Sequence, residues 1–303
     1  MDFVYSGIMD PTQIAVSHRE DDSFKQAAQV VSNLQKGGWR AYFVGGCVRD
    51  LMLDLKPQDY DIATDAKPED VKKIFPDAKG VGKRFGVSII DTPSGKFEIA
   101  AFREDGVYYD HRRPAWVKYA GMAEDATRRD FSINALYYDP VAGETIDLVD
   151  GIQDLNNRLL RMIDDPFERL DEDWLRLLRV VRFAARYSLL IERRTWDALR
   201  TLAPMIPGLS AERCTEEMRL MLQDKNAGRA IGLLKSSGLW RAMWPDLPFA
   251  RHRIRKVIRL LEKTGSKSAI WKCFFTDLPE ETVVKTCENL RLTRAEKRSL
   301  GIK

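Results

Sequence analysis

The sequence predicts an α+β fold in which a head with a small mixed β-sheet precedes an all-helical remainder. Short alternating apolar runs, typical of strands, are confined to about the first 150 residues. After about Gly151 these runs fade and helical periodicity takes over. The 303 residues, 44% apolar and 31% charged, suffice for two or three compact units with cores of their own.

The head reads as alternating helices and strands. A helix is expected over residues 23–36, because apolar side chains recur at helical spacing until Gly37 and Gly38 end it. Proline near its first turn favours a helix over 67–75. The other expected elements are a strand at 41–46, a short helix at 48–55, a strand at 59–64, a hairpin of 85–91 with 96–103 around the turn 92–95, and a second strand pair at 134–140 and 144–150.

The remainder reads as a succession of amphipathic helices. The apolar spacing predicts helices within 171–189, 211–223, 227–240 and 253–263. We therefore expect a catalytic head over 1–150, a helical segment over 151–224, and a second helical segment over 225–303.

Charge is unevenly distributed along the chain. The net charge is only +4, but residues 251–303 hold 14 Lys and Arg against 6 Asp and Glu. A basic C-terminal segment beside a mildly acidic remainder favours a polyanionic partner, with a solvated charged face as the alternative.

Cysteine spacing and apolar runs exclude several classes of protein. The four cysteines lie far apart without a C-x-x-C pair, so they are expected to be small buried apolar residues rather than zinc ligands or disulfides. The first residues lack the basic-then-apolar order of a secretory signal, and no apolar run approaches a membrane span. A cytoplasmic protein without a membrane partner is expected.

Two carboxylates, Asp59 and Asp61, lie one residue apart in a predicted strand. Residues i and i+2 of a strand point to the same side, so both side chains are expected to project together. Carboxylates that share two divalent metal ions are a recurring device of phosphoryl chemistry, and Glu98 on a nearby strand is placed to be the third. Without further motifs, a polar strand edge is the alternative.

Glycines 45 and 46 end the preceding strand and enter a helix. Glycines at such a junction let backbone N–H groups approach a phosphate closely. Arg49 adds a cation at the same point, whereas the Walker and dinucleotide-binding glycine patterns are absent. The stretch therefore predicts a site for a nucleoside triphosphate.

Two further clusters are ambiguous on their own. The first consists of Arg128, Arg129 and Asp130, followed four residues later by Asn134. It is either a set of ligands for a ribose and phosphates or a surface salt-bridge patch. Asp173 and Arg176 are expected to be neighbours on one helical face. A carboxylate acceptor beside guanidinium donors can hydrogen-bond to the Watson–Crick edge of a base. An ordinary surface ion pair is the alternative. A basic stripe is expected to continue along that helix at Arg179, Arg182 and Arg186.

Taken together, these segments resemble the bacterial-type (class II) tRNA nucleotidyltransferase and poly(A) polymerase family, and most of all a CCA-adding enzyme. The motifs that carry the resemblance are "VGGCVRD", "DYDIAT", "FEIAAFR", "RRDFSINALYYD" and "EDWLRLLRVVRFAAR", which follow one another in the family's order over about residues 27–187. The resemblance implies a nucleotidyltransferase head followed by an all-α neck and body that binds tRNA.

The resemblance also implies residue roles. Asp59 and Asp61 match the family's metal-binding pair for two Mg²⁺ ions, and Glu98 matches its third active-site carboxylate. Asp173 and Arg176 match the amino-acid template that selects CTP or ATP. The full set implied in nucleotide binding is Gly45, Gly46, Arg49, Arg128, Arg129, Asp130, Asn134, Glu172, Asp173, Arg176 and Arg179. The implied reaction is in-line attack of an RNA 3′-hydroxyl on an NTP α-phosphate.

Residues 102–121 look like the flexible loop that this family associates with the A-adding step. Asp110, Arg112 and Arg113 are therefore candidates for the switch from C to A addition. The expected partner is the 3′ end and acceptor stem of tRNA, with no DNA and no required protein partner. The alternatives are an A-adding specialist, a poly(A) polymerase, or a non-catalytic RNA-binding relative, and the three retained carboxylates disfavour the last.

Overall fold

The computed structural model describes residues 14, 16–81, 86–93, 95–264 and 269–302. It confirms the α+β class, with a mixed sheet in the N-terminal part and helices thereafter. Two predictions fall partly outside the described residues. One is that the first residues are not a secretory signal, and the other is the hairpin, of which Phe85 and Ser94 are not described.

The chain forms two compact units. The first comprises Met1–Tyr108 with Pro114–Asp164, and the second comprises Tyr109–Arg113 with Asp165–Lys303. The division at Asp164 comes later than the boundary expected at residue 150, and five residues of the loop segment belong to the second unit. The further division of the helical part near residue 224 stays a prediction.

A seven-stranded mixed sheet organises the first unit. Its strand order is β3-β4-β5-β2-β1-β8-β9, with β2 and β5 parallel and the other neighbours antiparallel. The strands of the sheet are β1 (Ala41–Val44), β2 (Asp61–Thr64), β3 (Lys79–Val81), β4 (Val87–Thr92), β5 (Gly95–Ala101), β8 (Leu136–Asp139) and β9 (Glu144–Asp147). Both predicted strand pairs, at 85–103 and 134–150, are thus present.

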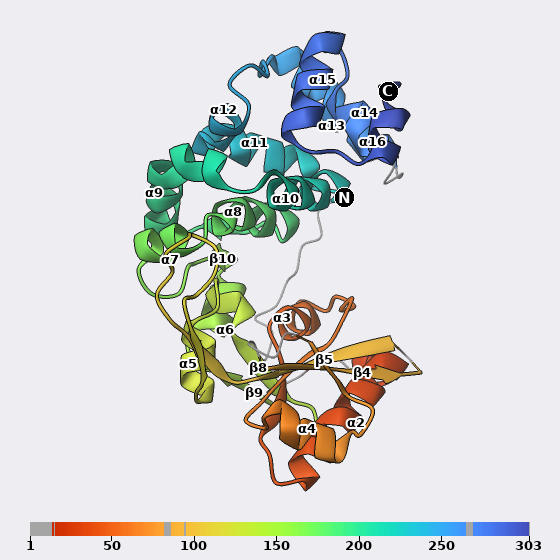
Figure 1. Ribbon diagram of the computed structural model, residues 1–303, viewed down its shortest axis with the longest axis vertical. Helices are drawn as coiled ribbons and strands as arrows, with labels where there is room; N and C mark the ends of the chain where they lie inside the picture. The colour runs from red at the N-terminus through yellow and green to blue at the C-terminus, as the bar shows by residue number, and fades with distance from the viewer. Residues whose placement is uncertain (1–13, 15, 82–85, 94, 265–268, 303) are drawn as a thin grey trace. The chain divides into compact units, whose positions relative to one another are not determined.

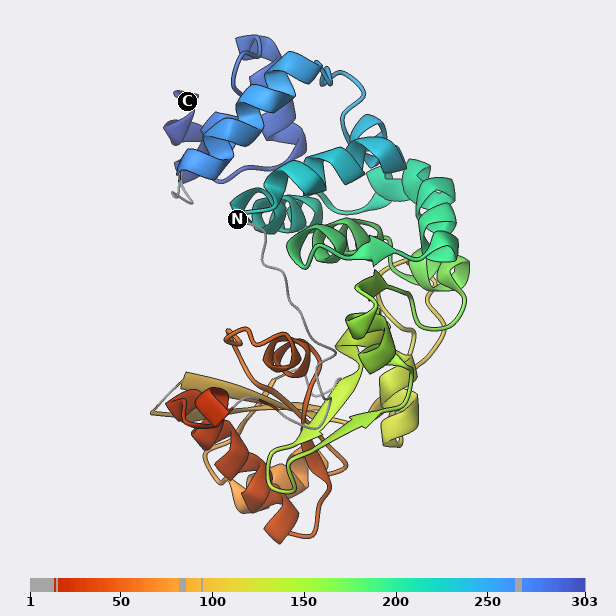
Figure 2. The same cartoon turned by 180° about the vertical axis from the view of Figure 1, so that it is seen from behind.

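Helices cover both faces of this sheet. Helices α2 and α4 lie on one face and α3 on the other (Figure 1 and Figure 2). Asp21 caps α2 by accepting from the Ser23 N–H, and Pro68 opens α4 at its first turn. The helical segments of this unit are α1 (Val16–Arg19), α2 (Asp22–Lys36), α3 (Gly46–Met52), α4 (Pro68–Ile74), α5 (Met122–Thr127), the 3₁₀ turn η1 (Ser132–Asn134) and α6 (Gly151–Asn156).

A small hairpin forms the two ends of the expected loop. Strands β6 (Arg103–Asp105) and β7 (Val117–Tyr119) pair antiparallel, and Tyr108 and Pro114 form one more bridge before the tip. The segment is therefore a hairpin with a short tip rather than a structureless loop. A two-residue strand, β10 (Leu159–Leu160), follows near the end of the unit.

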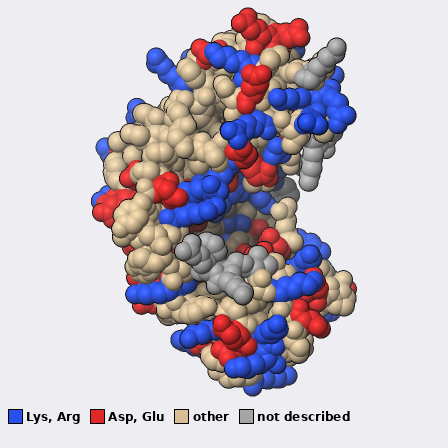
Figure 3. Space-filling model, in the orientation of Figure 1, with Lys and Arg blue, Asp and Glu red and all other residues tan. Residues whose placement is uncertain are grey.

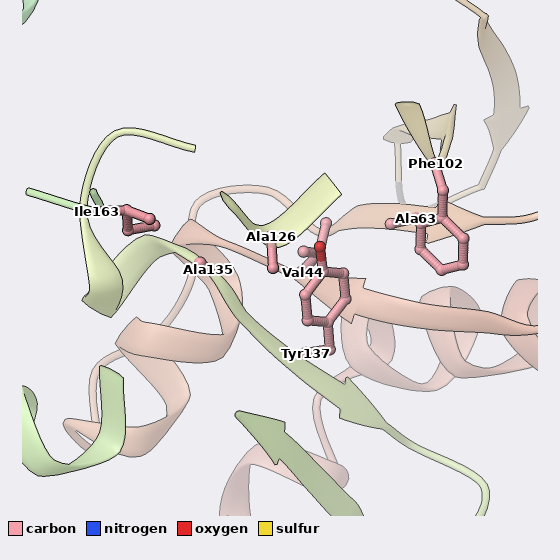
Figure 4. Packing of buried hydrophobic residues seen from close by; sticks show 7 residues of the cluster. All are labelled: Val44, Ala63, Phe102, Ala126, Ala135, Tyr137 and Ile163. Atoms are coloured by element: carbon pink, nitrogen blue, oxygen red, sulfur yellow. The ribbon is translucent and has the colours of Figure 1, made fainter. Parts of the chain in front are cut away.

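Buried apolar side chains join the sheet to the segments that carry the polar motifs. Figure 4 shows the cluster, in which Tyr137 of β8 lies near Val44 of β1 and Ala126 of α5. All of its members are at most 3% exposed: Val44, Ala63, Phe102, Ala126, Ala135, Tyr137 and Ile163. This packing fixes α5 and the segment after it against the ends of β1 and β2.

The second unit is almost wholly helical in its described part. Its elements are α7 (Pro166–Glu172), α8 (Leu175–Arg186), β11 (Leu190–Ile191), α9 (Arg193–Leu202), η2 (Ala203–Gly208), α10 (Ala211–Gln223), α11 (Ala227–Ser237), α12 (Leu239–Met243), α13 (Arg251–Thr264), α14 (Ile270–Phe274), α15 (Glu280–Asn289) and α16 (Arg294–Ser299). Lys and Arg side chains are prominent on the visible face of the last helices (Figure 3). None of the described helices combines the length and apolarity that a membrane span requires.

Helix α8 is the centre of this unit and packs against α10 and α11. The basic residues expected along this helix are all partly exposed: Arg179, Arg182 and Arg186. Arg182 Nε donates to Glu217 Oε2 of α10 at 2.6 Å, with both side chains largely buried. Arg229 of α11 donates to the carbonyl of Ala184 in α8 and to that of Leu189, three residues after the helix ends. The four cysteines of the chain are buried thiols, as expected of small apolar residues.

Candidate active site

All three predicted carboxylates lie in the first unit. Asp61 is the first residue of β2, and in the parallel register its partner on β5 is Glu98. Asp59 precedes the strand rather than lying in it, which corrects the predicted strand start. Burial still alternates as expected, because Asp59 and Asp61 are exposed while Tyr60 and Ile62 are buried.

The electrostatics of Asp61 reflect this crowding of like charges. Partial desolvation by surrounding atoms and the carboxylates of Asp59 and Glu98 raise the pKa of Asp61 to about 6. The guanidinium of Arg129 opposes that shift. Although the Asp61 side chain touches solvent, the neighbouring carboxylates make its ionised form costly. The cluster therefore favours a bound cation.

Carboxylate oxygens are the ligands that Mg²⁺ prefers, so the chemistry of this donor set fits such an ion. Within the described residues, however, no three His, Cys, Asp or Glu side chains come close enough together to hold a metal ion. The carboxylates thus act on one another electrostatically without forming a closed cage. An open arrangement of this kind leaves room for ligands from a substrate.

Gly45 lies next to the segment that carries Arg129 and Asn134. Its backbone has φ +76°, and a Cβ there would lie 3.2 Å from Arg129 Nη1 and 3.4 Å from the Asn134 carbonyl oxygen. Its N–H donates to the carbonyl of Leu136 at 3.0 Å. Only glycine suits this left-handed backbone and close approach. Segments more than 80 residues apart in sequence therefore meet at one place.

Arg49 is held inside this junction rather than presented to solvent. Its side chain is 5% exposed, and it donates to Asp50 Oδ1 at 2.7 Å and to the side-chain oxygen of Asn134. Asn134 in turn donates to Asp130 Oδ1 at 3.0 Å. The contact of Arg49 with a phosphate stays a prediction. In the structure its side chain links the glycine motif to the motif that contains Asn134.

Arg128 and Arg129 share one buried carboxylate. Asp125 of α5, 1% exposed, accepts from Arg128 Nη2 at 2.6 Å, from Arg129 Nη2 at 2.9 Å and from the Tyr137 hydroxyl at 2.7 Å. Desolvation alone would raise the pKa of Asp125, but the two guanidinium groups outweigh it and lower the pKa to about 2. The arginines are therefore held in place, which disfavours a loose surface patch.

The base-reading motif lies in the second unit at a break between helices. Glu172 ends α7, Asp173 is extended with φ −143° and ψ 105°, and α8 begins at Leu175. The expected continuous helix is therefore wrong at this point. Asp173 Oδ1 instead accepts from the Leu175 N–H at the first residue of α8, at 3.0 Å.

Asp173 and Arg176 are each paired with a different residue. Arg213 Nη2 of α10 donates to Asp173 Oδ2 at 2.8 Å. Arg176, 7% exposed, donates from Nη1 to Glu172 Oε2 at 2.6 Å. The backbone N–H of Arg176 also donates to the Asp173 carbonyl at 2.8 Å, so the two residues are neighbours at the start of α8, and their role as a base-reading pair stays a prediction. Further along α8, the guanidinium of Arg179 lies over the Phe183 ring at 5.1 Å.

The candidate switch residues form the tip of the β6–β7 hairpin and belong to the second unit. Asp110 Oδ1 accepts from the backbone N–H groups of Arg112 at 3.0 Å and Arg113 at 2.7 Å. This bonding gives a tight turn with both arginine side chains exposed.

Comparison with known proteins identifies the family of this chain. Residues 41–161 match a family model described as the poly A polymerase head domain, and residues 189–250 match one described as a probable RNA and SrmB-binding site of polymerase A. The solved structure of the Bacillus stearothermophilus CCA-adding enzyme in complex with CTP is 30% identical with a TM-score of 0.69, and the match covers 93% of this chain and 67% of that one. The chain belongs to the tRNA nucleotidyltransferase and poly(A) polymerase family.

Curated members of the family include both kinds of enzyme. The CCA-adding enzyme of Bacillus licheniformis is 37% identical over 256 residues, which is 84% of this chain and 64% of that protein. Poly(A) polymerase I of Haemophilus influenzae is 36% identical over 253 residues, which is 79% of this chain and 55% of that protein. This member of the family thus spans a little over half to about two thirds of those relatives.

The family assignment confirms the resemblance inferred from the motifs, while the residue roles stay predictions. In the first unit, the structure brings the acidic residues together with Gly45, Arg129 and Asn134. Sequence reasoning missed Asp125 and Arg213, which hold the predicted residues. Asp125 had a local signal, because it lies three and four residues before the arginine pair on a short helix. Arg213 had none, because it lies 40 residues from its partner.

Proposed function

We propose that this chain is a template-independent nucleotidyltransferase that adds CMP and AMP to the 3′ end of tRNA, building CCA from CTP and ATP with release of pyrophosphate. The observation that carries the proposal is the register pairing of Asp61 with Glu98, next to Asp59 and Arg129. Carboxylates are placed together in this way in enzymes that act on phosphate groups, where bound divalent metal ions compensate their charge.

In this proposal the first unit binds the triphosphate. The backbone turn at Gly45 lets the phosphates approach, and Arg129 supplies positive charge there because Asp125 fixes its guanidinium. Asp59, Asp61 and Glu98 hold negative charge beside it for two Mg²⁺ ions. When bound, these ions supply activation of the attacking 3′-hydroxyl and charge stabilisation on the triphosphate.

The second unit reads the base. Asp173 offers an acceptor and Arg176 a set of donors, which match the hydrogen-bonding edge of a nucleobase. Because both groups are engaged with Arg213 and Glu172, base binding exchanges protein ion pairs for hydrogen bonds to the nucleotide. A base that fails to satisfy both groups leaves a buried charge unpaired, and this penalty is the source of selectivity.

The proposed partner is tRNA, gripped at its 3′ end and acceptor stem. The basic helices after residue 250 support this part of the proposal, because phosphate contacts by Lys and Arg are the main source of affinity for nucleic acid. Binding is then expected to weaken steeply with added salt. A cytoplasmic location is part of the same proposal, and no protein partner is required by it.

Primer extension tests the proposal. The two substrates are a tRNA lacking all of CCA and a tRNA ending in CC, each with CTP, ATP or both and with Mg²⁺. Addition of three nucleotides to the first, followed by a stop, is the expected result. Extension of only the CC-ended tRNA by one A would replace CCA addition by A addition, and no extension of either would refute the proposal.

A poly(A) polymerase is the second candidate, since a curated poly(A) polymerase is 36% identical to this chain. The same assay separates the two activities. A CCA-adding enzyme stops after the terminal A, whereas a poly(A) polymerase produces long ladders that depend on ATP alone and extends RNA other than tRNA.

A further inference from the structure

The guanidinium group of Arg128 lies between carboxylates from two separate elements. Its Nε and Nη2 donate to Asp125 Oδ1 of α5 at 2.9 and 2.6 Å. Its Nη1, at the other end of the planar group, lies 3.9 Å from Asp105 Oδ2 of β6. The Arg128 and Asp105 side chains are 16% and 9% exposed. Arg128 is therefore bordered by a largely buried carboxylate at each end, while part of its side chain still reaches solvent.

Asp105 is held in turn by two residues of its own hairpin. The Tyr108 hydroxyl donates to Asp105 Oδ2 at 3.1 Å, and Arg103 Nε lies 3.3 Å from Asp105 Oδ1. Strand β6 packs against α5, and the Arg103 N–H donates to Asp125 Oδ1 at 3.4 Å. The two carboxylates that border Arg128 thus belong to one network within the first unit.

The hydrophobic core anchors both sides of this network. Phe102, the residue before Arg103, and Ala126, the residue after Asp125, belong to the same buried cluster (Figure 4). Because closely packed interiors resist small displacements, the backbone that carries each carboxylate is held in place by more than its polar contacts. The network is therefore a firm support for the Arg128 guanidinium.

Two positive charges meet in this network. Burial lowers the pKa of Arg103, and the positive charge of Arg128 lowers it further. The carboxylate of Asp105 opposes both effects, since it lies 3.3 Å from the one guanidinium group and 3.9 Å from the other. Like charges repel most where a compensating charge between them is lost. Removal of the Asp105 charge is therefore expected to displace the Arg128 guanidinium.

Arg128 borders the glycine turn to which the proposed function assigns the triphosphate. It precedes Arg129, whose Nη1 lies 3.2 Å from the position of a Cβ at Gly45, and the two arginines share Asp125. A guanidinium group binds phosphate oxygens through N–H donors of fixed geometry, so the orientation of its plane affects affinity. Every nucleoside triphosphate presents such oxygens, whichever base it carries.

We propose that Asp105 is a positioning residue that orients Arg128 toward a phosphate group of the bound nucleoside triphosphate, equally for CTP and ATP. This role deepens the proposed function and rests on its assignment of the triphosphate to the first unit. Asp105 acts through Arg128 and makes no contact with the substrate. Glu104, the preceding residue on β6, pairs instead with the exposed Lys118 at 2.8 Å and offers a matched control.

Equilibrium binding of ATP and of CTP without tRNA, measured by isothermal titration calorimetry, tests this role. Asp105→Asn is expected to raise the Kd of both nucleotides by about three- to tenfold, the effect of one charged contact. Glu104→Gln also removes one negative charge and is expected to stay within about twofold of the wild type. Unchanged binding by Asp105→Asn, or an equal loss in Glu104→Gln, would overturn the proposal.

A double-mutant cycle shows whether Asp105 acts through Arg128. Arg128→Met is expected to weaken binding by itself, and the addition of Asp105→Asn to it is expected to change the Kd by less than about twofold. A general disturbance of the fold would instead weaken binding by the same factor in both backgrounds. Such additivity would refute a positioning role.

Tyr108→Phe tests the same contact if Asp105→Asn fails to fold. It removes the hydroxyl that donates to Asp105 and keeps every charge of the network. The Kd of both nucleotides is expected to rise by about two- to fivefold. Wild-type affinity in this variant would then count against the proposal.

Steady-state kinetics separate positioning from a part in the chemical step. A phosphate contact made in both the ground state and the transition state predicts that Asp105→Asn raises the KM for CTP and for ATP with kcat within about twofold. A loss confined to kcat, or to one of the two nucleotides, would overturn the proposal.

The binding measurements also distinguish failure of this role from failure of the proposed function. If the wild type binds both nucleotides but extends neither tRNA, the proposed function fails, and the double-mutant cycle still decides the role of Asp105. If the wild type binds neither nucleotide, the role of Asp105 is refuted as well.

Discussion

Asp61 and Glu98 oppose each other across the parallel strands β2 and β5, where burial and the carboxylates of Asp59 and Glu98 raise the pKa of Asp61 to about 6. Asp61→Asn is therefore expected to abolish nucleotide addition, with a loss of more than about 10³-fold. Because it removes one of three mutually repelling charges, it is also expected to leave the free energy of unfolding unchanged or higher. Single-turnover incorporation and urea denaturation measure the two effects. Retained activity would refute the assignment of this carboxylate.

The buried carboxylate of Asp125 accepts hydrogen bonds from Arg128, Arg129 and Tyr137, so its removal is expected to destabilise the first unit. Asp125→Asn removes the buried negative charge that Arg128 and Arg129 share, at a cost of about 3–5 kcal/mol. Urea denaturation of this unit provides the measurement. Asp91→Asn is the matched control, because Asp91 is an exposed partner of Lys79 and its loss is expected to cost less than about 1 kcal/mol.

The same carboxylate predicts the direction of a pH dependence. Its pKa in the folded protein, about 2, is below the value of an unfolded chain, so its contribution is present above pH ~4 and is lost as the pH falls toward 2. The stability gap between the wild type and Asp125→Asn is thus expected to narrow by about 2 kcal/mol between pH 5 and pH 2. A gap that is constant with pH would contradict the assigned ion pairs.

Neighbouring glycines 45 and 46 are expected to respond differently to substitution. Gly45→Ala forces a Cβ onto a left-handed backbone and toward Arg129, and is expected to cost about 1–2 kcal/mol and to raise the KM for NTP. Gly46→Ala meets only an ordinary contact of 3.5 Å with Arg49 and serves as the control. Similar effects for both would show that the backbone conformation at Gly45 is not what matters.

The buried pair Arg182–Glu217 predicts strong coupling between α8 and α10. Arg182→Met alone leaves the Glu217 carboxylate buried and unpaired, at an expected cost of about 3–5 kcal/mol. The double variant Arg182→Met, Glu217→Leu removes both charges and is expected to recover most of this loss. A double-mutant cycle in urea measures the coupling, and simple additivity would contradict it.

Sequence alone predicted what depends on local pattern. The β4–β5 hairpin was predictable because apolar residues alternate on both sides of a turn, and the alternation around Tyr60 correctly indicated that Asp59 and Asp61 share a side. The family was predictable because its five motifs keep their order. These features need only neighbours in sequence or a known pattern of residues.

The rest depends on partners that are distant in the chain. The apolar spacing of 171–189 predicts one helix, but the backbone is extended at Asp173, whose carboxylate accepts from the Leu175 N–H and pairs with Arg213. Arg182 continues the predicted basic stripe, but nothing in that spacing indicates its buried partner Glu217 on α10. Pairs of opposite charge that join separate helices leave no periodic signal, so their partners cannot be predicted from the sequence pattern.

The parallel pairing of β2 with β5 also has a consequence for how the protein is made. Parallel strands cannot be joined by a tight turn, so the chain must pass through α4, β3 and β4 before Glu98 reaches Asp61. Closing a loop of that length costs roughly 3 kcal/mol in chain entropy before any contact repays it. Nascent or partly folded chains therefore lack the assembled acidic site, and competence for catalysis is expected to arise late in folding, with this long-range closure.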